Sequence, residues 1–272
     1  MRSLHPVATG AFAGLLAAGS LRLLRAHPPG GAARWDRTNH AGGSVTLLEG
    51  PAYAAGAASA AALAGAGPGP VLAATASAGL GALDDLIGDS SSKGLKGHLG
   101  ALARGEVTTG AVKVLGLGLT GLATAVLVDR RVPAADRQAL VDTLVGGAVV
   151  AGSANLLNLL DLRPGRALKV TLAWGTLAAG TTGGRSAGAA AAGAAVGLLG
   201  PDLAGRAMLG DTGANSAGAL LGSALIQSTG RRGRLLSLAV LAGLTLASEK
   251  VSFTEVIEST PVLRDLDALG RR

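Results

Sequence analysis

Three short, well-separated segments of the sequence combine acidic or amide side chains with nearby glycines. The first contains the adjacent carboxylates Asp84 and Asp85 and is followed by Lys93. Two adjacent carboxylates repel each other unless a bound cation, or a role as a base, compensates for their charge. Such a pair is costly beside a membrane, so it indicates either a functional site or the start of a solvated loop.

The second segment contains Asn155, Asn158 and Asp161, each three residues from the next. On a helix this spacing places the three side chains along one stripe. Two amides and a carboxylate in one stripe form either the wall of a polar pocket or a row of hydrogen bonds to a neighbouring helix.

The third segment contains Gly210, Asp211, Thr212 and Gly213, directly before an apolar stretch. Asp and Thr are both common caps at the beginning of a helix, because their side-chain oxygens accept hydrogen bonds from the first free N–H groups. Taken alone, this segment therefore predicts a helix cap.

The composition shows which elements must position these residues. The chain has 272 residues, of which 49% are hydrophobic and 15% charged, and its mean hydropathy is +0.44. Soluble domains carry about 25% charged residues, and disordered chains are poor in apolar ones, so both classes are excluded. With no cysteine, disulfides and thiolate metal sites are excluded too. We therefore predict an all-α protein, a polytopic transmembrane helical bundle.

Nine apolar segments, separated by charged residues or by Pro and Gly, are predicted to span the membrane. The first is interpreted as an uncleaved span, with a cleavable signal peptide as the alternative. Residues 1–248 form the predicted transmembrane domain, and residues 249–272 a cytoplasmic amphipathic tail. The nine segments are 4–24, 46–66, 69–83, 108–128, 138–157, 168–181, 184–200, 214–229 and 234–248.

Most of the 24 Lys and Arg residues lie in every second connection between these segments. The positive-inside rule places those connections in the cytoplasm, with the N-terminus outside and the C-terminus inside. The same rule explains the net charge of +7 without a nucleic-acid partner. All three polar segments fall on the cytoplasmic side, while Asp129, Asp136 and Asp142 fall on the other. Acidic residues do not determine topology, so their concentration on one side favours a functional site there.

Taken in order, the three segments resemble the motifs of the polyprenyl-phosphate N-acetylhexosamine-1-phosphate transferases, a glycosyltransferase 4-like family. Phospho-N-acetylmuramoyl-pentapeptide transferase and the UDP-N-acetylglucosamine-1-phosphate transferases belong to this family. The resemblance covers most of the chain. It implies transfer of a sugar 1-phosphate from a UDP-sugar to polyprenyl phosphate, with release of UMP, in cell-envelope glycan synthesis at the bacterial plasma membrane. The matching elements are Asp84-Asp85, Asn155-xx-Asn158-xx-Asp161 and Gly210-Asp211-x-Gly213, with a looser match at residues 37–43.

The resemblance also implies a role for each residue. Asp211 would be the protein ligand of Mg²⁺, or of Mn²⁺ in its place. The implied partners are the membrane, the UDP-sugar and the polyprenyl phosphate, and a homodimer is compatible with it. The implied catalytic residues are Asp84, Asp85 and Asp161, and the implied substrate-binding residues are Lys93, Asn155 and Asn158.

The chain also departs from the family pattern. The carboxylate expected shortly after Asp161 is missing, and a serine usual after the Gly-Asp-x-Gly motif is Ala214. A histidine-rich motif implicated in sugar-nucleotide recognition is absent near the C-terminus, where no histidine follows His98. These departures keep a second hypothesis open, in which a non-catalytic relative binds polyprenyl phosphate or a lipid-linked intermediate as a scaffold or regulator. A small transporter is a third hypothesis, disfavoured by the few charges within the predicted spans.

Overall fold

The computed structural model describes residues 4–39, 42–87, 109–129 and 137–271. This part of the chain forms eleven α-helices and one short hairpin. The hairpin consists of β1 (Asp36–Thr38) and β2 (Ser44–Thr46), preceded by a 3₁₀ turn at Ala32–Arg34. The helices are α1 (Pro6–Ala26), α2 (Glu49–Leu63), α3 (Pro68–Ile87), α5 (Thr109–Asp129), α6 (Arg137–Leu160), α7 (Arg166–Ala179), α8 (Arg185–Leu203), α9 (Gly210–Ser228), α10 (Arg231–Ser248), α11 (Phe253–Ser259) and α12 (Pro261–Ala268).

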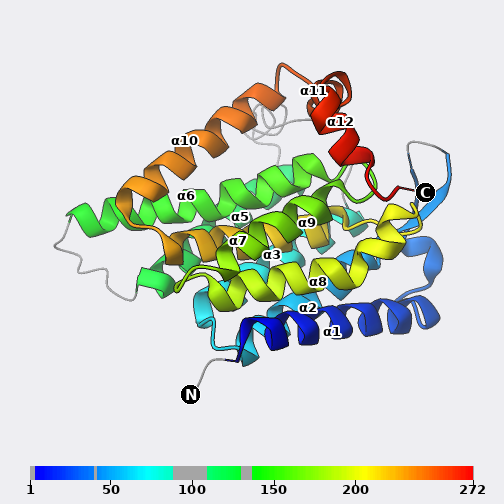
Figure 1. Ribbon diagram of the computed structural model, residues 1–272, viewed down its shortest axis with the longest axis horizontal. Helices are drawn as coiled ribbons and strands as arrows, with labels where there is room; N and C mark the ends of the chain where they lie inside the picture. The colour runs from blue at the N-terminus through cyan, green and yellow to red at the C-terminus, as the bar shows by residue number, and fades with distance from the viewer. Residues whose placement is uncertain (1–3, 40–41, 88–108, 130–136, 272) are drawn as a thin grey trace.

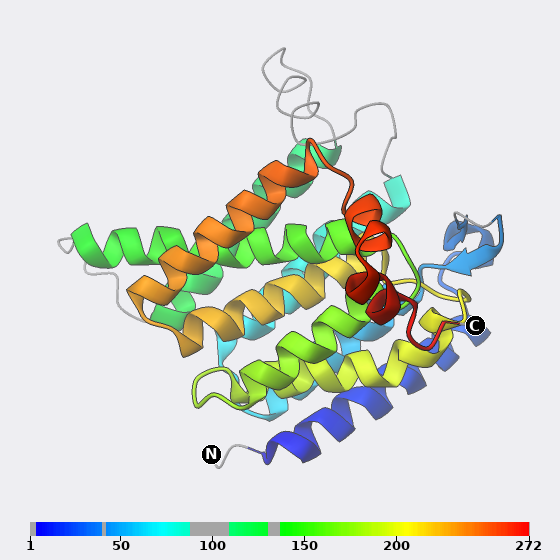
Figure 2. The same ribbon diagram turned by 45° about the horizontal axis from the view of Figure 1, so that its top comes forward.

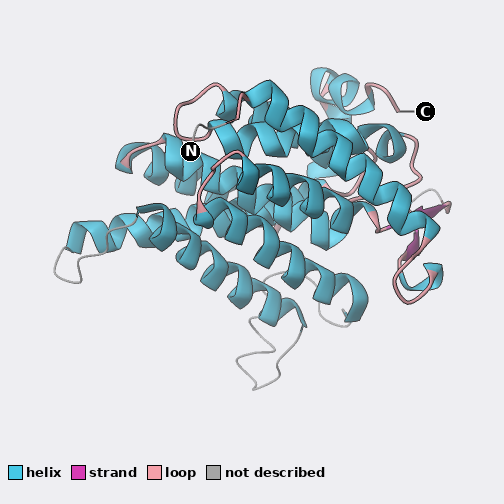
Figure 3. Ribbon diagram, turned by 90° about the horizontal axis from the view of Figure 1, so that it is seen from below, coloured by secondary structure: helices cyan, strands magenta, loops and turns pink. Residues whose placement is uncertain are grey.

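Most of the helices lie side by side along the long axis of the molecule (Figure 1). Helix α9 forms the centre of the bundle, because it packs against α3 and α6 on two sides and against α2 on a third. Residues 212–224 of α9 are all buried. The hairpin, the C-terminal helices and the connections before α7 and α9 gather at one end of the bundle, and Figure 3 shows the strands there.

Small residues allow the helices to approach closely. Helix α1 crosses α8 at two Gly-xxx-Gly pairs of the sequence, Gly10/Gly14 and Gly193/Gly197. A methyl group at Gly193 would overlap the Gly10 backbone, so only glycine permits this contact. Close backbone contact between small residues is a common way for helices to associate in membranes, where hydrophobic burial does not distinguish lipid from protein.

The end of the bundle opposite the hairpin is held together by Arg234 of α10. Its guanidinium donates to both carboxylate oxygens of Asp129, at 2.7 and 3.1 Å, and to the Ile226 carbonyl at 2.9 Å. Thr143 donates a further hydrogen bond to Asp129 at 3.0 Å. These contacts connect the end of α5 to α6 and α10, and they explain how a buried arginine is accommodated there.

The structure confirms the all-α class and corrects the number of spans. In the described residues, α1, α3, α5 and α6 are long and apolar enough to cross a membrane. The pair α10 and α11, bent by 93°, adds a fifth candidate. Such helices indicate a multi-pass membrane protein, but the prediction of nine spans is wrong.

Length and composition explain the difference. Helices α2 and α7 have 15 and 14 residues, so each is only about 22 Å long, shorter than a hydrocarbon core of about 30 Å. Helix α9 has 19 residues but carries Asp211, Asn215 and Gln227 and is enclosed by other helices. Its apolar character therefore reflects burial in the protein as well as the membrane environment.

Candidate functional site

The acidic residues at the end of α3 and the beginning of α9 lie together around a lysine. Lys113, from the first turns of α5, places its ammonium 3.0 Å from Asp84 Oδ2 and 2.7 Å from Asp211 Oδ2. All three side chains are largely buried, with exposed fractions of 17–20%. The ammonium thus compensates for two carboxylates that would otherwise repel each other.

None of the three sequence motifs contains Lys113. The residue lies within an apolar stretch that was assigned to a membrane span as a whole. The charge of Lys113 is the sequence feature that could have identified it, because an isolated lysine inside an apolar segment normally marks a functional or paired position.

Asp85 points to the first turn of α9 and caps it. Its Oδ1 accepts the Asp211 N–H at 3.0 Å, and its Oδ2 accepts the Thr212 N–H at 2.9 Å and the Thr212 hydroxyl at 2.6 Å. Neither Asp211 nor Thr212 is the N-cap residue, which is Leu209; the Asp211 carboxylate pairs with Lys113, and the Thr212 hydroxyl donates to Asp85. The helix cap that the third motif predicts is therefore supplied by a residue of α3, through space.

Asp161 approaches the same turn from the connection between α6 and α7. Its Oδ2 accepts the N–H of Gly210 at 2.8 Å, and Gly210 has a positive φ of 59°. Burial raises the pKa of Asp161 well above its usual value, and the nearby charge of Asp202 raises it further. The structure thus brings Asp84, Asp85, Asp161 and Asp211 together around the first turn of α9.

The predicted substrate-binding residues Asn155 and Asn158 make contacts that do not involve the first turn of α9. Asn155 donates a hydrogen bond to the Thr245 hydroxyl of α10 at 3.1 Å, which is the helix–helix role that the sequence left as an alternative. The Asn158 backbone carbonyl accepts the N–H of Asp161 at 3.2 Å, and its side chain is half-buried. Lys93 lies outside the described residues.

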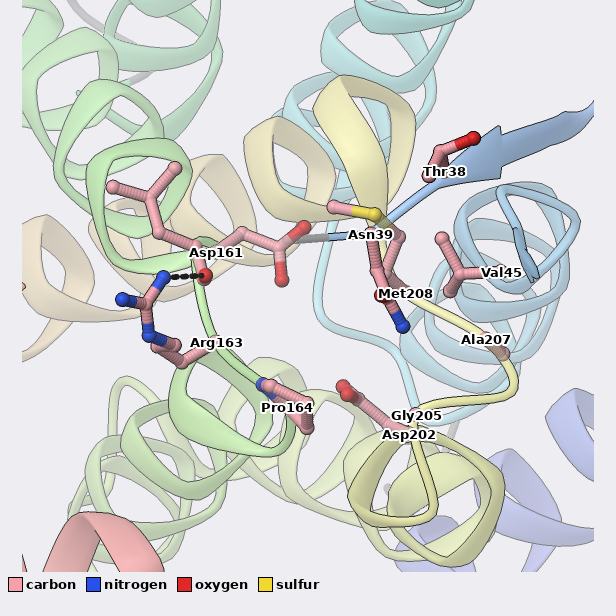
Figure 4. A pocket seen from close by; sticks show the side chains of 11 residues that line it. Thr38, Asn39, Val45, Asp161, Arg163, Pro164, Asp202, Gly205, Ala207 and Met208 are labelled. Carbon is pink, nitrogen blue, oxygen red and sulfur yellow. Dashed lines mark hydrogen bonds between the residues drawn. The ribbon is translucent and has the colours of Figure 1, made fainter. Parts of the chain in front are cut away.

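A cavity of about 310 Å³ opens beside this turn (Figure 4). Asp161 and Asp202 reach it from different sides, and Asn39 of the hairpin faces it as well. Arg163 turns its guanidinium to the Leu162 carbonyl at 3.2 Å. The lining residues are Thr38, Asn39, Val45, Asp161, Leu162, Arg163, Pro164, Asp202, Gly205, Ala207 and Met208.

The hairpin is fixed to the rest of the site by backbone contacts and one arginine. The Met208 N–H donates to the Thr46 carbonyl at 3.1 Å, next to a bridge between Thr46 and Ala207. Arg37 donates to the backbone carbonyl of Asp85. Thr38 and Asn39, in the segment with the loosest resemblance, therefore line one side of the cavity, and Arg37 beside them contacts the end of α3.

Asp202, at the end of α8, is a site residue that the sequence motifs did not reveal. It is only 2% exposed, its Oδ1 accepts the Gly165 N–H at 2.9 Å, and its Oδ2 is buried without a hydrogen-bond partner. Burial raises the pKa of Asp202 to about 6, although the Gly165 N–H and the charge of Lys169 act in the opposite direction. The only sequence signal was a carboxylate beside Pro201 at the end of an Ala- and Gly-rich helix.

This shift predicts how stability depends on pH. Between the usual value of 3.8 and about 6, the folded protein holds a proton on Asp202 that the unfolded chain releases. The contribution of this group to the free energy of unfolding is therefore largest below this window and falls by about 3 kcal/mol as the pH rises through it. We expect Asp202→Asn to raise the thermal unfolding midpoint at pH 7.5 and to change it little at pH 4. The exposed Asp265 provides the control Asp265→Asn, and an Asp202→Asn effect independent of pH would contradict the prediction.

The carboxylates of Asp84 and Asp211 fit a divalent cation by their chemistry. Mg²⁺ is usually held by one or two protein carboxylates together with water and substrate phosphate oxygens. In the part of the chain that the structure describes, no cluster of three or more Asp, Glu, His or Cys side chains is arranged as a metal site. Asp85 and Asp161 use their oxygens to hold the start of α9. A metal here would thus depend on two protein ligands and on the substrate.

The described residues thus form a polar site at one end of a helical bundle. It consists of two carboxylates paired with one lysine, two further carboxylates that hold the turn beside them, and an adjacent cavity with a buried, half-unpaired aspartate. Such a site is suited to binding and stabilising charged phosphate groups rather than to forming a covalent nucleophile with a separate base.

No protein-family model matches the chain, and no curated protein matches it either.

Proposed function

We propose that this protein transfers a sugar 1-phosphate, an N-acetylhexosamine phosphate, from a UDP-sugar to polyprenyl phosphate in a bacterial plasma membrane. One observation carries the proposal: four carboxylates from three distant segments converge with Lys113 on the first turn of α9. These segments are the ones in which the sequence resembles the transferases. The proposal places this end of the bundle in the cytoplasm, where the basic connections are expected.

In the proposed reaction, an oxygen of the lipid phosphate attacks the phosphorus that carries the sugar. The bond from this phosphorus to the oxygen that bridges the two phosphates breaks, and UMP leaves with that oxygen. Phosphoryl transfer of this kind depends mainly on positioning and on stabilising negative charge. Lys113 supplies a positive charge to the phosphate oxygens, and Asp84 and Asp211 orient its ammonium.

Asp84 and Asp211 would also hold Mg²⁺, or Mn²⁺ in its place. The bound ion would neutralise the charge of the diphosphate and polarise its oxygens. Asp85 and Asp161 act by positioning in this proposal, because their hydrogen bonds fix the backbone from which Asp211 projects. Their assigned role therefore changes from direct catalysis to support of the site.

The cavity offers a place for the nucleotide. Its volume of about 310 Å³ is at the lower end of the range for small-molecule sites. Val45 and Met208 provide apolar contacts for a flat ring, while Asp202 has a free oxygen that accepts a hydrogen bond from a ring N–H. Asp161 lies between this cavity and the first turn of α9, as expected if the nucleotide and the reacting phosphates occupy neighbouring positions.

The test is formation of UMP by the purified full-length protein in sealed vesicles that contain undecaprenyl phosphate. We expect Mg²⁺-dependent UMP release when a suitable UDP-N-acetylhexosamine is added on the side that carries the C-terminal tail. Vesicles of known opposite orientation serve as the control, because the nucleotide sugar does not cross the bilayer. Failure to release UMP with any of a panel of UDP-sugars would contradict the proposed activity, and release from the opposite side would contradict the orientation.

A second function, binding of polyprenyl phosphate without catalysis, is supported by the hydrogen bonds that Asp85 and Asp161 make to α9. Both oxygens of Asp85 and one oxygen of Asp161 are engaged in holding α9, so two of the three predicted catalytic residues already have a structural role. A relative that binds polyprenyl phosphate through Lys113 without turnover would retain this arrangement. Saturable binding of undecaprenyl phosphate by wild type, lost in Lys113→Met and unaccompanied by UMP release, would favour the scaffold or regulator.

A further inference from the structure

The C-terminal helices α11 and α12 fold back over the connection between α6 and α7. They follow the sharp bend after α10 and lie at the end of the bundle where the cavity opens (Figures 1 and 2). This placement puts the last residues of the chain next to Pro164, because Arg271 donates a hydrogen bond to the Pro164 carbonyl at 3.0 Å.

A buried ion pair anchors the second of these helices. Arg166 donates from Nε to Asp267 Oδ1 and from Nη2 to Asp267 Oδ2, at 2.8 Å in both cases. The side chains are 3% and 7% exposed. Arg271 adds a hydrogen bond to Asp267 Oδ2 at 2.7 Å. A two-pronged arginine–carboxylate pair has a specific geometry, and removing one partner leaves the other charge buried and uncompensated.

Further contacts fall on the same short stretch of the chain. Lys169 donates to the carbonyls of Leu266 and Asp267 at 3.1 and 2.6 Å, near the end of α12. A lysine at this position satisfies carbonyls that have no partner within the helix. Arg166 also contacts the Thr254 hydroxyl of α11 at 3.0 Å. The tail is thus attached to residues 163–169 from several directions.

Apolar burial contributes little to this attachment. The large hydrophobic side chains of α12 and its end face outward, with exposed fractions of 42–69%, while the acidic Asp267 faces the protein. This is the reverse of a helix that docks on a soluble protein through its apolar face. The polar contacts therefore hold the tail in place. The outward-facing residues are Val262, Leu263, Leu266 and Leu269.

The anchored stretch is continuous with the candidate site. Asp161, Arg163 and Pro164 line the cavity, and Asp161 holds the Gly210 N–H at the start of α9. A short connection thus lies between the tail on one side and the first turn of α9 on the other. We infer that Asp267 and Arg166 are positioning residues, through which the C-terminal tail fixes the cavity wall and the Asp161 carboxylate.

The first test measures local order and does not depend on activity. In the full-length protein in nanodiscs, we expect Asp267→Asn to increase hydrogen–deuterium exchange at least tenfold in peptides that cover residues 161–166. Peptides from the buried part of α9 should remain unchanged. The matched control is Asp265→Asn, two residues away, whose carboxylate is 71% exposed and pairs only with its neighbour Arg264. Unchanged exchange at 161–166 in Asp267→Asn, or an equal increase in the control, would overturn the inference.

A second variant covers the case in which Asp267→Asn does not fold. Arg271→Ala removes the contacts to Pro164 and Asp267 from a side chain that is 27% exposed, so it leaves the central ion pair in place. We expect the same segment to exchange faster, by a smaller factor of about threefold. Protection equal to wild type in this variant would also contradict the inference.

The kinetic part of the inference rests on the proposed function. Asp267→Asn is expected to raise the KM for the UDP-sugar about tenfold and the KM for the lipid phosphate much less, since the anchored stretch forms part of the cavity wall itself and reaches the phosphate site only through the Asp161 hydrogen bond to Gly210. An equal loss with both substrates would indicate a general loss of folded protein and overturn the positioning role. If wild type releases no UMP, the proposed function fails, while the exchange experiment still decides whether the tail fixes residues 161–166.

Discussion

Replacing Asp211 with asparagine is expected to reduce UMP formation by about 10²–10³-fold, the usual effect of losing one well-placed electrostatic contact in an active site. The carboxylate lies 2.7 Å from the Lys113 ammonium, and asparagine keeps its size but removes its charge. Both the orientation of Lys113 and the binding of a divalent cation would be weakened. The fold should persist, because the first N–H groups of α9 are capped by Asp85 and not by Asp211.

The measurement is Mg²⁺-dependent UMP release by wild type and Asp211→Asn at equal amounts of folded protein. Asp265→Asn again serves as a control, because that residue lies on the exposed face of the tail. Thermal unfolding of both variants should match wild type within a few degrees. A fully active Asp211→Asn protein would remove Asp211 from the phosphate and metal site.

Replacing Gly81 with alanine is expected to destabilise the protein by about 3 kcal/mol, at the upper end of the cost of overpacking. A Cβ atom at Gly81 would lie 2.6 Å from the Thr212 backbone nitrogen and closer still to the Asp211 carbonyl. Both obstacles are backbone atoms, so no side-chain rotation can relieve the overlap. Helix α3 would have to move away from α9, which would also separate Asp84 and Asp85 from the first turn of α9.

The same helix provides a sensitive control. A Cβ atom at Gly79 meets no atom within 4 Å, so Gly79→Ala should be neutral or stabilise the helix by up to about 1 kcal/mol. We expect the thermal unfolding midpoint of Gly81→Ala to fall well below wild type and that of Gly79→Ala to equal or exceed it. Equal midpoints for the two variants would show that the contact between α3 and α9 is not essential.

The sequence predicted the helical class from local apolar patterns, and the grouping of the acidic residues from their shared side of the predicted topology and from the family resemblance. Apolar segments reveal helices, and the order of the motifs indicates which residues belong to one site. Hydropathy alone could not distinguish α9, which is enclosed by other helices, from α1 and α5, which are less buried and are candidate membrane spans. This limitation explains the excess of predicted spans.

The partners of the acidic residues depend on packing between distant segments, which no periodicity reveals. Asp85 and Thr212 are 127 residues apart, so the capping role of Asp85 follows only from the approach of α3 to α9. The contacts of Lys113 with Asp84 and Asp211 likewise follow only from the packing of distant segments. Asp202 belongs to none of the motifs and Asn39 only to the loosest match, and both become neighbours of Asp161 only when three connections meet around the cavity.

The capping of α9 by Asp85 also determines where this site obtains positive charge. The free N–H groups at the start of a helix, with its dipole, normally offer a ready binding place for phosphate. Here the N–H groups of Asp211 and Thr212 already donate to a carboxylate of the protein itself. The positive end of α9 is therefore neutralised from within, and in the proposed reaction the attraction of an anionic substrate falls to side chains such as Lys113 rather than to the backbone.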